Sequence, residues 1–452
     1  MKRLFALFIF TFALSTFAAA QNPYVPNILP MRERAKVIDQ LLKDRVETVL
    51  PMLMRRSGID MWVIISREYN EDPVLKTFLP STWQSARRTT ILVVFDPGEG
   101  KKLETYAMAR YAVGEIFKKA WDKKKQPDQW KALADMIVAK DPKKIGVDRS
   151  ETFALSDGIS STHYDQLVSS LPDDLKGRVV SAENLAIGWL ETRTESEMAI
   201  YPNIVRIAKQ IIAEGLSEKV IQPGVTTTDD VVWWYRDRIR ELKLTTWFHP
   251  SVSVQRKDSA KFDHLKAFSE GEEDQVILPG DLIHVDFGIT YLRLNTDTQQ
   301  HAYVLLPGET EPPAFLREAL KKANRVQDIL TGNFRTGRTG NQILAASLAQ
   351  CATESIKCSI YTHPIGFHGH AAGTTIGLWD QQGGVPFAGD YPMYPMTAHS
   401  IELNAASFIK EWGKEIRIML EEDAFFDGES VRYIDGRQTE LFVIPRPLPP
   451  NK

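Results

Sequence analysis

An apolar segment that is interrupted by one carboxylate constrains this chain more than any other feature. In the run Leu282–Ile289, successive side chains are expected to point to opposite faces, as in a β-strand. Three large apolar residues of the run share one face, and Asp286 lies on the other; the three are Ile283, Val285 and Phe287. A buried carboxylate is costly unless it is paired, hydrogen-bonded or bound to a metal ion. The fold must therefore supply a compensating partner for Asp286.

Four further side chains of metal-ligand type follow Asp286 in the last third of the chain. Asp297 comes eleven positions later, and three more residues complete the series: His363, Glu402 and Glu422. Asp286 and Asp297 can face each other across neighbouring strands, although an Asx-turn is the alternative for Asp297. Four carboxylates and one imidazole suit Mn²⁺, Fe²⁺, Co²⁺ or Zn²⁺. The series predicts one dinuclear site, where two ions about 3.5–4 Å apart hold a bridging hydroxide that can hydrolyse an amide.

Three of the nine histidines of the chain lie in the segment His363–His370, which reads His-Pro-Ile-Gly-Phe-His-Gly-His. A solvated loop that binds adventitious metal is the alternative interpretation of this segment. Glu402 and Glu422 lie between apolar residues, where the alternative is an exposed glutamate on a strand face. The order of all five residues favours the metal site over these separate interpretations.

The first twenty residues have the pattern of an export signal. Lys2 and Arg3 precede the apolar stretch Leu4–Leu14, and Ala18–Ala20 is a small-residue cleavage site. A membrane anchor is the alternative, but the apolar run is shorter than the roughly 20 residues that a span needs. We therefore expect a soluble protein that is secreted or periplasmic and has no membrane partner once residues 1–20 are removed.

Composition and element order predict an α/β chain of more than one domain. The 452 residues are 43% hydrophobic and 25% charged, which is ordinary for globular proteins, but the chain is longer than one ordinary domain. Residues 31–57 and 126–140 have helical periodicity, whereas Thr90–Phe95 and Leu103–Arg110 are predicted to form a hairpin. A boundary is expected near Thr192–Glu197, where a long amphipathic helix begins. The net charge of −3 excludes the basic surface of a nucleic-acid-binding protein.

Cys351 and Cys358 are the two cysteines of the chain. Both fall in or next to a stretch, 340–357, that is predicted to be helical. Seven residues of continuous helix rise roughly 10 Å, which is too far for a disulfide, so two free buried thiols are expected. A disulfide remains open if the helix ends between them, because an exported protein meets oxidising conditions.

The order of these motifs resembles the pita-bread metallopeptidases, which include methionine aminopeptidases, aminopeptidase P, prolidases and the metal-independent creatinase. The motifs cover about residues 194–445, and residues 21–190 resemble the N-terminal domain of the aminopeptidase P and prolidase branch in size and element order. The resemblance implies an α/β (α+β) protein with a C-terminal pita-bread catalytic domain, 191–452. A smaller creatinase-like α/β domain, 21–190, would precede it. It also implies a peptide substrate, two divalent ions with Mn²⁺ preferred over Zn²⁺, Co²⁺ or Fe²⁺, and a homodimer.

The resemblance further implies a role for each ligand. Asp286 would chelate one metal, Asp297 would bridge both, and His363 and Glu402 would bind the other. Glu402 would also act as general base toward the bridging water. Glu422 would be the second bridge, because Glu422 and Asp423 reproduce the family's Glu-Asp pair, with the adjacent Glu421 as the alternative.

Two further histidines match family positions that line the substrate pocket. His370 would contact the substrate carbonyl or the scissile nitrogen, and His264 would stabilise the reaction intermediate. The chain departs from the family at Pro364, where a glycine is usual, and at Ala371, where a glutamate is frequent. These departures affect the expected substrate preference and leave the ligand set complete.

The function implied is an exopeptidase that hydrolyses Xaa-Pro bonds, either an aminopeptidase or a dipeptidase. The nitrogen of such a bond carries no N–H and lies in a constrained ring, which a shaped pocket can select. A prolidase would also need an arginine for the dipeptide's free carboxylate, with Arg293 and Arg417 as candidates. Two alternatives remain open: a creatinase-like, metal-independent C–N hydrolase, and a secreted, non-catalytic peptide-binding protein.

Overall fold

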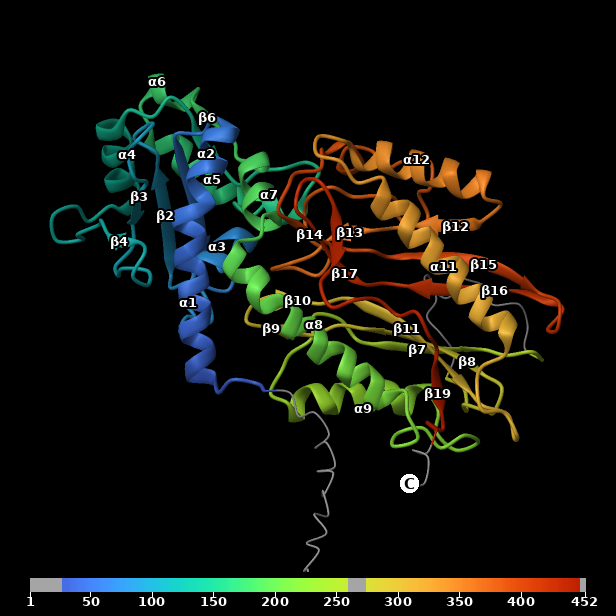
Figure 1. Ribbon diagram of the computed structural model, residues 1–452. Coiled ribbons are helices and arrows are strands. Elements are labelled where there is room, and N and C mark those ends of the chain that lie inside the picture. The colour runs from blue at the N-terminus through green and yellow to red at the C-terminus, as the bar shows by residue number, and fades with distance from the viewer. Residues whose placement is uncertain (1–26, 259–273, 448–452) are drawn as a thin grey trace, which may run out of the picture.

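Two bodies of secondary structure lie side by side in the computed structural model, which describes residues 27–258 and 274–447 (Figure 1). The N-terminal body is built on a six-stranded sheet with the order β4-β3-β2-β1-β5-β6. Its strands are β1 (Met61–Arg67), β2 (Thr89–Phe95), β3 (Glu104–Ala107), β4 (Lys118–Lys119), β5 (Ile145–Val147) and β6 (Val179–Ser181). The predicted hairpin is confirmed, because β2 and β3 pair antiparallel. The division of the chain at residues 190 and 191 stays a prediction.

Helices cover both faces of this sheet. Successive side chains of β1 point to opposite faces of the sheet. Met61 and Val63 enter one apolar cluster, and Trp62 and Ile64 enter another. Because both faces are buried, the sequence of the strand is a continuous apolar run. The covering helices are α2 (Leu50–Ser57), α3 (Pro73–Phe78), α4 (Gln129–Lys140), α5 (Ser161–Ser170), α6 (Asp173–Lys176) and α7 (Glu183–Glu191). The predicted helix 31–57 is divided into α1 (Met31–Thr48) and α2, and Pro51, which lacks an N–H, lies in the first turn of α2.

The C-terminal body contains two packed groups of strands. One sheet has the order β19-β11-β8-β7, and two others have the orders β12-β15-β16 and β13-β14-β17-β18. The strands of the first are β7 (Ser251–Gln255), β8 (Leu282–Phe287), β11 (Thr298–Val304) and β19 (Phe442–Ile444). Those of the others are β12 (Lys357–Ile360), β13 (His363–Pro364), β14 (Thr397–Ser400), β15 (Leu403–Ile409), β16 (Lys414–Leu420), β17 (Asp423–Phe426) and β18 (Val431–Tyr433). A short pair, β9 (Thr290–Tyr291) and β10 (Leu294–Asn295), completes the body.

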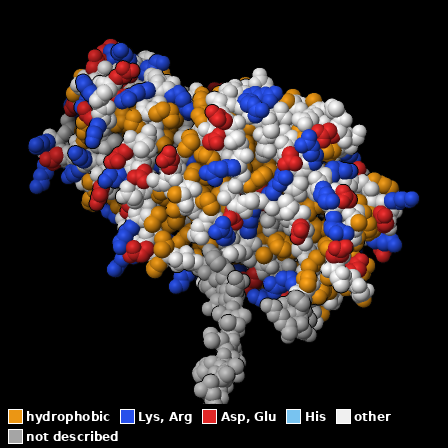
Figure 2. Space-filling view, viewed as in Figure 1, with side chains coloured by type: hydrophobic (Ala, Val, Ile, Leu, Met, Phe, Trp, Pro, Cys, Tyr) orange, Lys and Arg blue, Asp and Glu red, His pale blue; other side chains and the backbone are white. Residues whose placement is uncertain are grey.

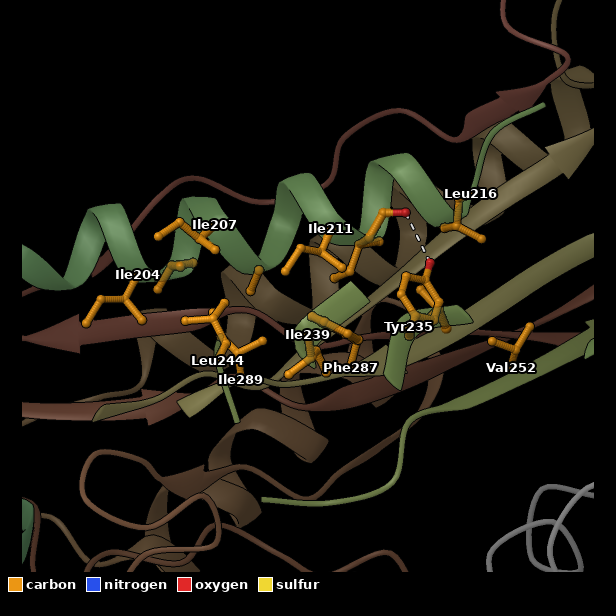
Figure 3. Packing of buried hydrophobic residues seen from close by; sticks show 14 of the residues in the cluster. Ile204, Ile207, Ile211, Leu216, Tyr235, Ile239, Leu244, Val252, Phe287 and Ile289 are labelled. Atoms are coloured by element: carbon orange, nitrogen blue, oxygen red, sulfur yellow. Dashed lines mark hydrogen bonds between the residues drawn. The ribbon is translucent and has the colours of Figure 1, made fainter. Parts of the chain in front are cut away.

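Two pairs of helices flank these strands. Helices α8 (Glu195–Gly215) and α9 (Thr228–Glu241) pack on β7 and β8 through the apolar face of α8, as Figure 3 shows for Ile204, Ile207 and Ile211. The hydroxyl of Tyr235 on α9 donates to the carbonyl of Ile212 at 3.1 Å. Helices α11 (Ala314–Gly332) and α12 (Gly340–Thr353) cover the sheet that contains β15. The strands between these pairs are therefore shielded from both sides.

The predicted end of the helix 340–357 is wrong. Helix α12 ends at Thr353, and Ser355 adopts a left-handed conformation with φ of 55° before β12 begins at Lys357. The N–H of Ile356 donates back to the carbonyl of Cys351 at 2.8 Å, which closes the helix. Cys351 and Cys358 are therefore on different elements, and both are free thiols, the first buried and the second half-buried.

Buried charges join the two bodies. Arg45 on α1 is fully buried and donates to Glu197 on α8 at 2.8 Å, while its guanidinium lies 4.4 Å from the ring centroid of Trp189. A buried ion pair of this kind is costly to break, because either partner alone would be left uncompensated.

On the face of the molecule shown in Figure 2, positively and negatively charged side chains are interspersed.

Within residues 27–258 and 274–447, no helix combines the length and the apolar character that a membrane crossing requires. The predicted export signal, residues 1–20, lies outside the described residues.

Candidate metal centre

Five acidic or histidine side chains converge between the two groups of strands. Their potential ligand atoms form overlapping groups in which all atoms lie within 4.8 Å of one another. One group contains Asp286, Asp297 and Glu421, and a second contains His363, Glu402 and Glu421. Four of the five predicted ligands are therefore brought together from segments that lie far apart in the sequence. The fifth position is filled by Glu421.

Glu422, which the sequence analysis assigned as the second bridge, does not face this cluster. Its Oε2 lies 2.7 Å from Nζ of Lys209 on α8, and its Oε1 accepts the N–H of Gln438 at 2.7 Å. Successive residues of an extended segment point to opposite faces, so Glu421 and Glu422 cannot both face the cluster. The pairing of the backbone of Glu421 with Gln299 selects Glu421. The neighbouring Asp423 accepts the N–H of Asp297 at 3.3 Å.

The two glutamates of the cluster are held by one amide. Gln299 on β11 donates from its Nε2 atom to Glu402 and, at 2.7 Å, to Oε2 of Glu421. The Oε1 atom of Gln299 lies 2.8 Å from Nε2 of His284, which sets the orientation of the amide. Ser400 adds a hydroxyl donor to Oε1 of Glu421 at 2.6 Å. No motif in the sequence indicated Gln299, because its role depends on its position opposite Asp286 in the pairing of β8 with β11.

The imidazole of His363 is oriented for ligation. Its Nδ1 lies 3.0 Å from the carbonyl oxygen of Pro364, so Nδ1 carries the proton and Nε2 is left with a free lone pair. Nε2 lies 3.6 Å from Oδ2 of Asp297, 3.4 Å from Oε1 of Glu421 and 3.9 Å from Oε2 of Glu402. It is buried and has no hydrogen-bond donor or acceptor among the described residues. At these distances from the carboxylate oxygens, Nε2 of His363 could bind the same cation as the carboxylates.

The electrostatics of the cluster also fit a cation. Burial raises the pKa of Asp297 well above its ordinary value, and the charges of Glu421 and Asp286 raise it further. Burial and the same two neighbours raise the pKa of Glu402 well above its ordinary range. In the described part of the structure, Oδ1 of Asp297 is buried without a hydrogen-bond partner. Divalent ions would offset both the repulsion and the lost hydration.

A cavity of about 630 Å³ opens beside the cluster, between the two bodies of the chain. The N-terminal body contributes Lys76 and Thr77 of α3, and the C-terminal body contributes aromatic and histidine side chains that include Trp247 and Phe367. His370 connects the cavity to the cluster, because its ring centroid lies 4.7 Å from that of His363 and 5.0 Å from that of Trp247. The role expected for His370, contact with the substrate carbonyl or the scissile nitrogen, stays a prediction.

His368 lines the same cavity, and burial lowers its pKa to about 4, so it is neutral near pH 7. The sequence analysis assigned no ligand role to His368, and it is absent from the groups of potential ligand atoms among the described residues. His264 lies outside the described residues, and its predicted role in the pocket stays a prediction.

Solved structures with the same architecture come from the Xaa-Pro peptidases. The X-Pro aminopeptidase of Thermotoga maritima matches with a TM-score of 0.60 at 17% identity, covering 87% of this chain and 99% of that one. The Xaa-Pro dipeptidase of Bacillus anthracis matches with a TM-score of 0.54 at 16% identity, covering 92% and 100%. The prolidase of Pyrococcus horikoshii matches with a TM-score of 0.55 at 14% identity, covering 91% and 100%. A comparison with curated protein sequences gave no match.

The fold and the carboxylate–histidine cluster define a metal-dependent peptidase of pita-bread fold that carries an additional N-terminal α/β domain. Residues 203–423 match the description Metallopeptidase family M24, and the chain belongs to that family. The predicted fold class and family are thereby confirmed.

Proposed function

We propose that this metallopeptidase is a dinuclear exopeptidase that cleaves Xaa-Pro bonds. The observation that supports this most is the convergence of the cluster beside a cavity to which both bodies of the chain contribute. The solved structures of similar fold are described as an X-Pro aminopeptidase, an Xaa-Pro dipeptidase and a prolidase, which favours proline after the scissile bond.

The ligand roles in this proposal follow from the overlap of the groups. Among the carboxylates, Asp297 and Glu421 each belong to two groups, whereas Asp286 and Glu402 each belong to one; His363 also belongs to two, but its imidazole offers one free nitrogen. Asp297 and Glu421 are therefore suited to bridge, with Asp286 on one side and His363 and Glu402 on the other. Two divalent ions held there would supply a nucleophile from water near neutral pH and polarise the peptide carbonyl. We propose Mn²⁺, with Zn²⁺, Co²⁺ or Fe²⁺ as alternatives, because carboxylates dominate the set.

Glu402 is the residue that we assign to proton transfer. Its Oε1 is held by Gln299, while Oε2 remains on the side of the cluster, 3.9 Å from Nε2 of His363. A carboxylate beside the attacking water can exchange a proton with it between two steps of the reaction. Glu402 would take the proton from the attacking water and deliver it to the proline nitrogen, which has no N–H of its own.

His370 is positioned to meet the substrate. It is exposed toward the cavity and belongs to a ligand-atom group with Asp297 and His363. A donor at this boundary can stabilise the charge that develops on the carbonyl oxygen. His264 is part of the same proposal on the strength of its sequence position.

The lining of the cavity favours an anionic group on the substrate. None of the described residues that line it is acidic, and Lys76 and Arg293 bring positive charge from the two bodies of the chain. The Nη1 atom of Arg293 donates to the carbonyl of Leu79 at 2.7 Å, which fixes its side chain. Arg417, the other candidate, donates to Asn404 at 2.7 Å and is not among the lining residues described. We propose that the substrates are short peptides whose free C-terminal carboxylate is received by Lys76 and Arg293.

We also propose that residues 1–20 export the protein to the periplasm or the extracellular medium, and that it acts as a homodimer. Protein recovered from a secreted fraction without its first twenty residues would support export.

The deciding experiment is a panel of Xaa-Pro dipeptides, tripeptides and longer peptides, with Xaa-Ala peptides as controls. Each is assayed with chelated protein and with Mn²⁺ or Zn²⁺ restored. Metal-dependent turnover of Xaa-Pro peptides alone is expected. Turnover that survives chelation would favour a creatinase-like, metal-independent hydrolase, and binding without turnover would favour a peptide-binding protein.

A further inference from the structure

The two cysteines of the chain meet at the junction of α12 and β12. Cys351 lies in the last turn of α12, and Cys358 is the second residue of β12. Between them the chain reverses direction through Ser355, whose φ is 55°. Cys351 belongs to the apolar cluster beneath α11 and α12, and Cys358 packs against the same cluster. Each thiol shifts the pKa of the other: the pKa of Cys351 is lowered by Cys358, and that of Cys358 is raised by Cys351.

This contact exists because the helix stops early. In a continuous helix, seven residues would separate the two positions by roughly 10 Å along the axis. A disulfide requires Cα atoms about 4.4–6.8 Å apart, with the two Cβ atoms directed toward each other. Here the helix ends at Thr353, the N–H of Ile356 donates to the carbonyl of Cys351 at 2.8 Å, and both cysteines lie at one apolar cluster. Oxidation therefore requires a local adjustment and no rearrangement of the fold.

We propose that Cys351 and Cys358 form a reversible disulfide that ties α12 to β12. The oxidant is a donor disulfide, either of a protein or of a small thiol. The half-buried Cys358 sulfur attacks one donor sulfur and breaks the donor S–S bond. Cys351 then attacks the Cys358 sulfur of the mixed disulfide. One S–S bond replaces another, the two thiol hydrogens end on the two donor sulfurs, and the donor is reduced as the protein is oxidised.

The proposed disulfide would restrain β12, the strand that precedes His363 in the chain. β12 pairs antiparallel with β15, from Lys357 opposite Ala406 to Ile360 opposite Leu403, directly after Glu402. Two residues beyond β12, the hydroxyl of Thr362 donates to the carbonyl of Glu402 at 3.0 Å, and His363 follows. A covalent link at Cys358 therefore restrains the strand that precedes one ligand and supports another. It also reduces the conformational freedom of the unfolded chain.

The experiment uses the purified full chain and needs no substrate, so its outcome is independent of the proposed peptidase function. One sample is incubated with oxidised glutathione and one with dithiothreitol. Free thiols are counted after denaturation, and the peptides are mapped by mass spectrometry without reduction. The oxidised sample is expected to have no free thiol and one linked peptide pair containing Cys351 and Cys358. Its Tm is expected to exceed that of the reduced sample by on the order of 2–5 °C.

Matched variants complete the test. Cys358→Ser changes the half-buried position, and Cys351→Ala changes the buried one. In either variant the difference in Tm between oxidised and reduced samples should disappear. Two thiols that remain free after oxidation would overturn the proposal. A glutathione adduct on Cys358 with Cys351 still free would also overturn it, as would a linked pair with no gain in Tm.

Discussion

The Oε1 atom of Glu421 lies 3.4 Å from Nε2 of His363, whereas the adjacent Glu422 is turned into a buried ion pair with Lys209. These two glutamates have the same charge and nearly the same sequence context, yet Glu421 belongs to the carboxylate–histidine cluster and Glu422 pairs with Lys209 on α8. Their different surroundings make them separable by mutation.

Glu421→Gln should abolish metal-dependent turnover, with a loss of about 100-fold or more, because one carboxylate shared by both groups of ligands is removed. Glu422→Gln should retain turnover but lower the free energy of unfolding by about 2–4 kcal/mol, because the half-buried Lys209 would lose its counter-charge. Activity assays and urea denaturation of both variants provide the measurement. The reverse pattern would restore Glu422 as the ligand.

Gln299→Leu should weaken metal binding by about 10–100-fold, because Glu402 and Glu421 both lose the donor that orients them. The matched control is Gln300→Leu, since Gln300 points to the opposite face and its amide lies 3.3 Å from Glu422. Titration calorimetry with Mn²⁺ measures both affinities. Equal metal affinity in the wild type and Gln299→Leu would show that the amide has no orienting role.

Chelation should lower both activity and Tm, and Mn²⁺ should restore both. The cause is the repulsion among four clustered carboxylates, which a bound cation relieves. At a free metal concentration of 100 times Kd, binding to the native state contributes about 2.7 kcal/mol. Asp297→Asn serves as the control, because its Tm should respond less to metal. A chelated protein that keeps its activity and its Tm would contradict the metal-dependent proposal.

Glu191 should make the protein less stable as the pH rises. Burial raises the pKa of this carboxyl to about 8, although the hydroxyl of Tyr391 donates to it at 2.9 Å. The folded state therefore keeps a proton that the unfolded state releases near its ordinary pKa. The corresponding stability is fully present below about pH 4.5 and is lost progressively toward pH 8, by at most about 5 kcal/mol.

Glu191→Gln should remove this dependence, so its stability curve between pH 5 and 8 should be flatter than that of the wild type. Glu195→Gln, an exposed change at the start of α8, should keep the wild-type slope. Denaturant titrations at several pH values measure the three curves. A Glu191→Gln curve that runs parallel to the wild type would rule out Glu191 as the source.

Lys76→Met should raise KM for Xaa-Pro peptides with a free C-terminus by about tenfold, since a charge-assisted hydrogen bond contributes about 1.5–3 kcal/mol. kcat should change little, because Lys76 lines the cavity from the N-terminal body and belongs to none of the groups of potential ligand atoms among the described residues. For peptides with an amidated C-terminus, Lys76→Met and the wild type should have similar KM values. Lys43→Met, an exposed change on α1, is the control. Equal KM values for free and amidated peptides in the wild type would remove the carboxylate site from the proposal.

Much of the fold follows from local pattern. The apolar runs that became β1 and β2 and the turn between β2 and β3 are visible in the sequence, because burial and turn chemistry leave periodic signals. The end of α12 was not predicted, because no glycine or proline marks it and the left-handed position is occupied by Ser355, a residue type that rarely adopts this conformation. The division of the long N-terminal helix was likewise missed.

The sequence by itself determined the chemical character of the candidate site. It supplied four carboxylates and one histidine, and these side chains are the usual ligands of divalent metal ions. It singled out Asp286, Asp297, His363 and Glu402, which the structure brings together. Only the tertiary structure decided between Glu421 and Glu422, placed Gln299 between two carboxylates and brought Lys76 to the cavity. Local periodicity shows that neighbours in a strand face opposite ways, but which one faces inward depends on pairing with residues more than a hundred positions away.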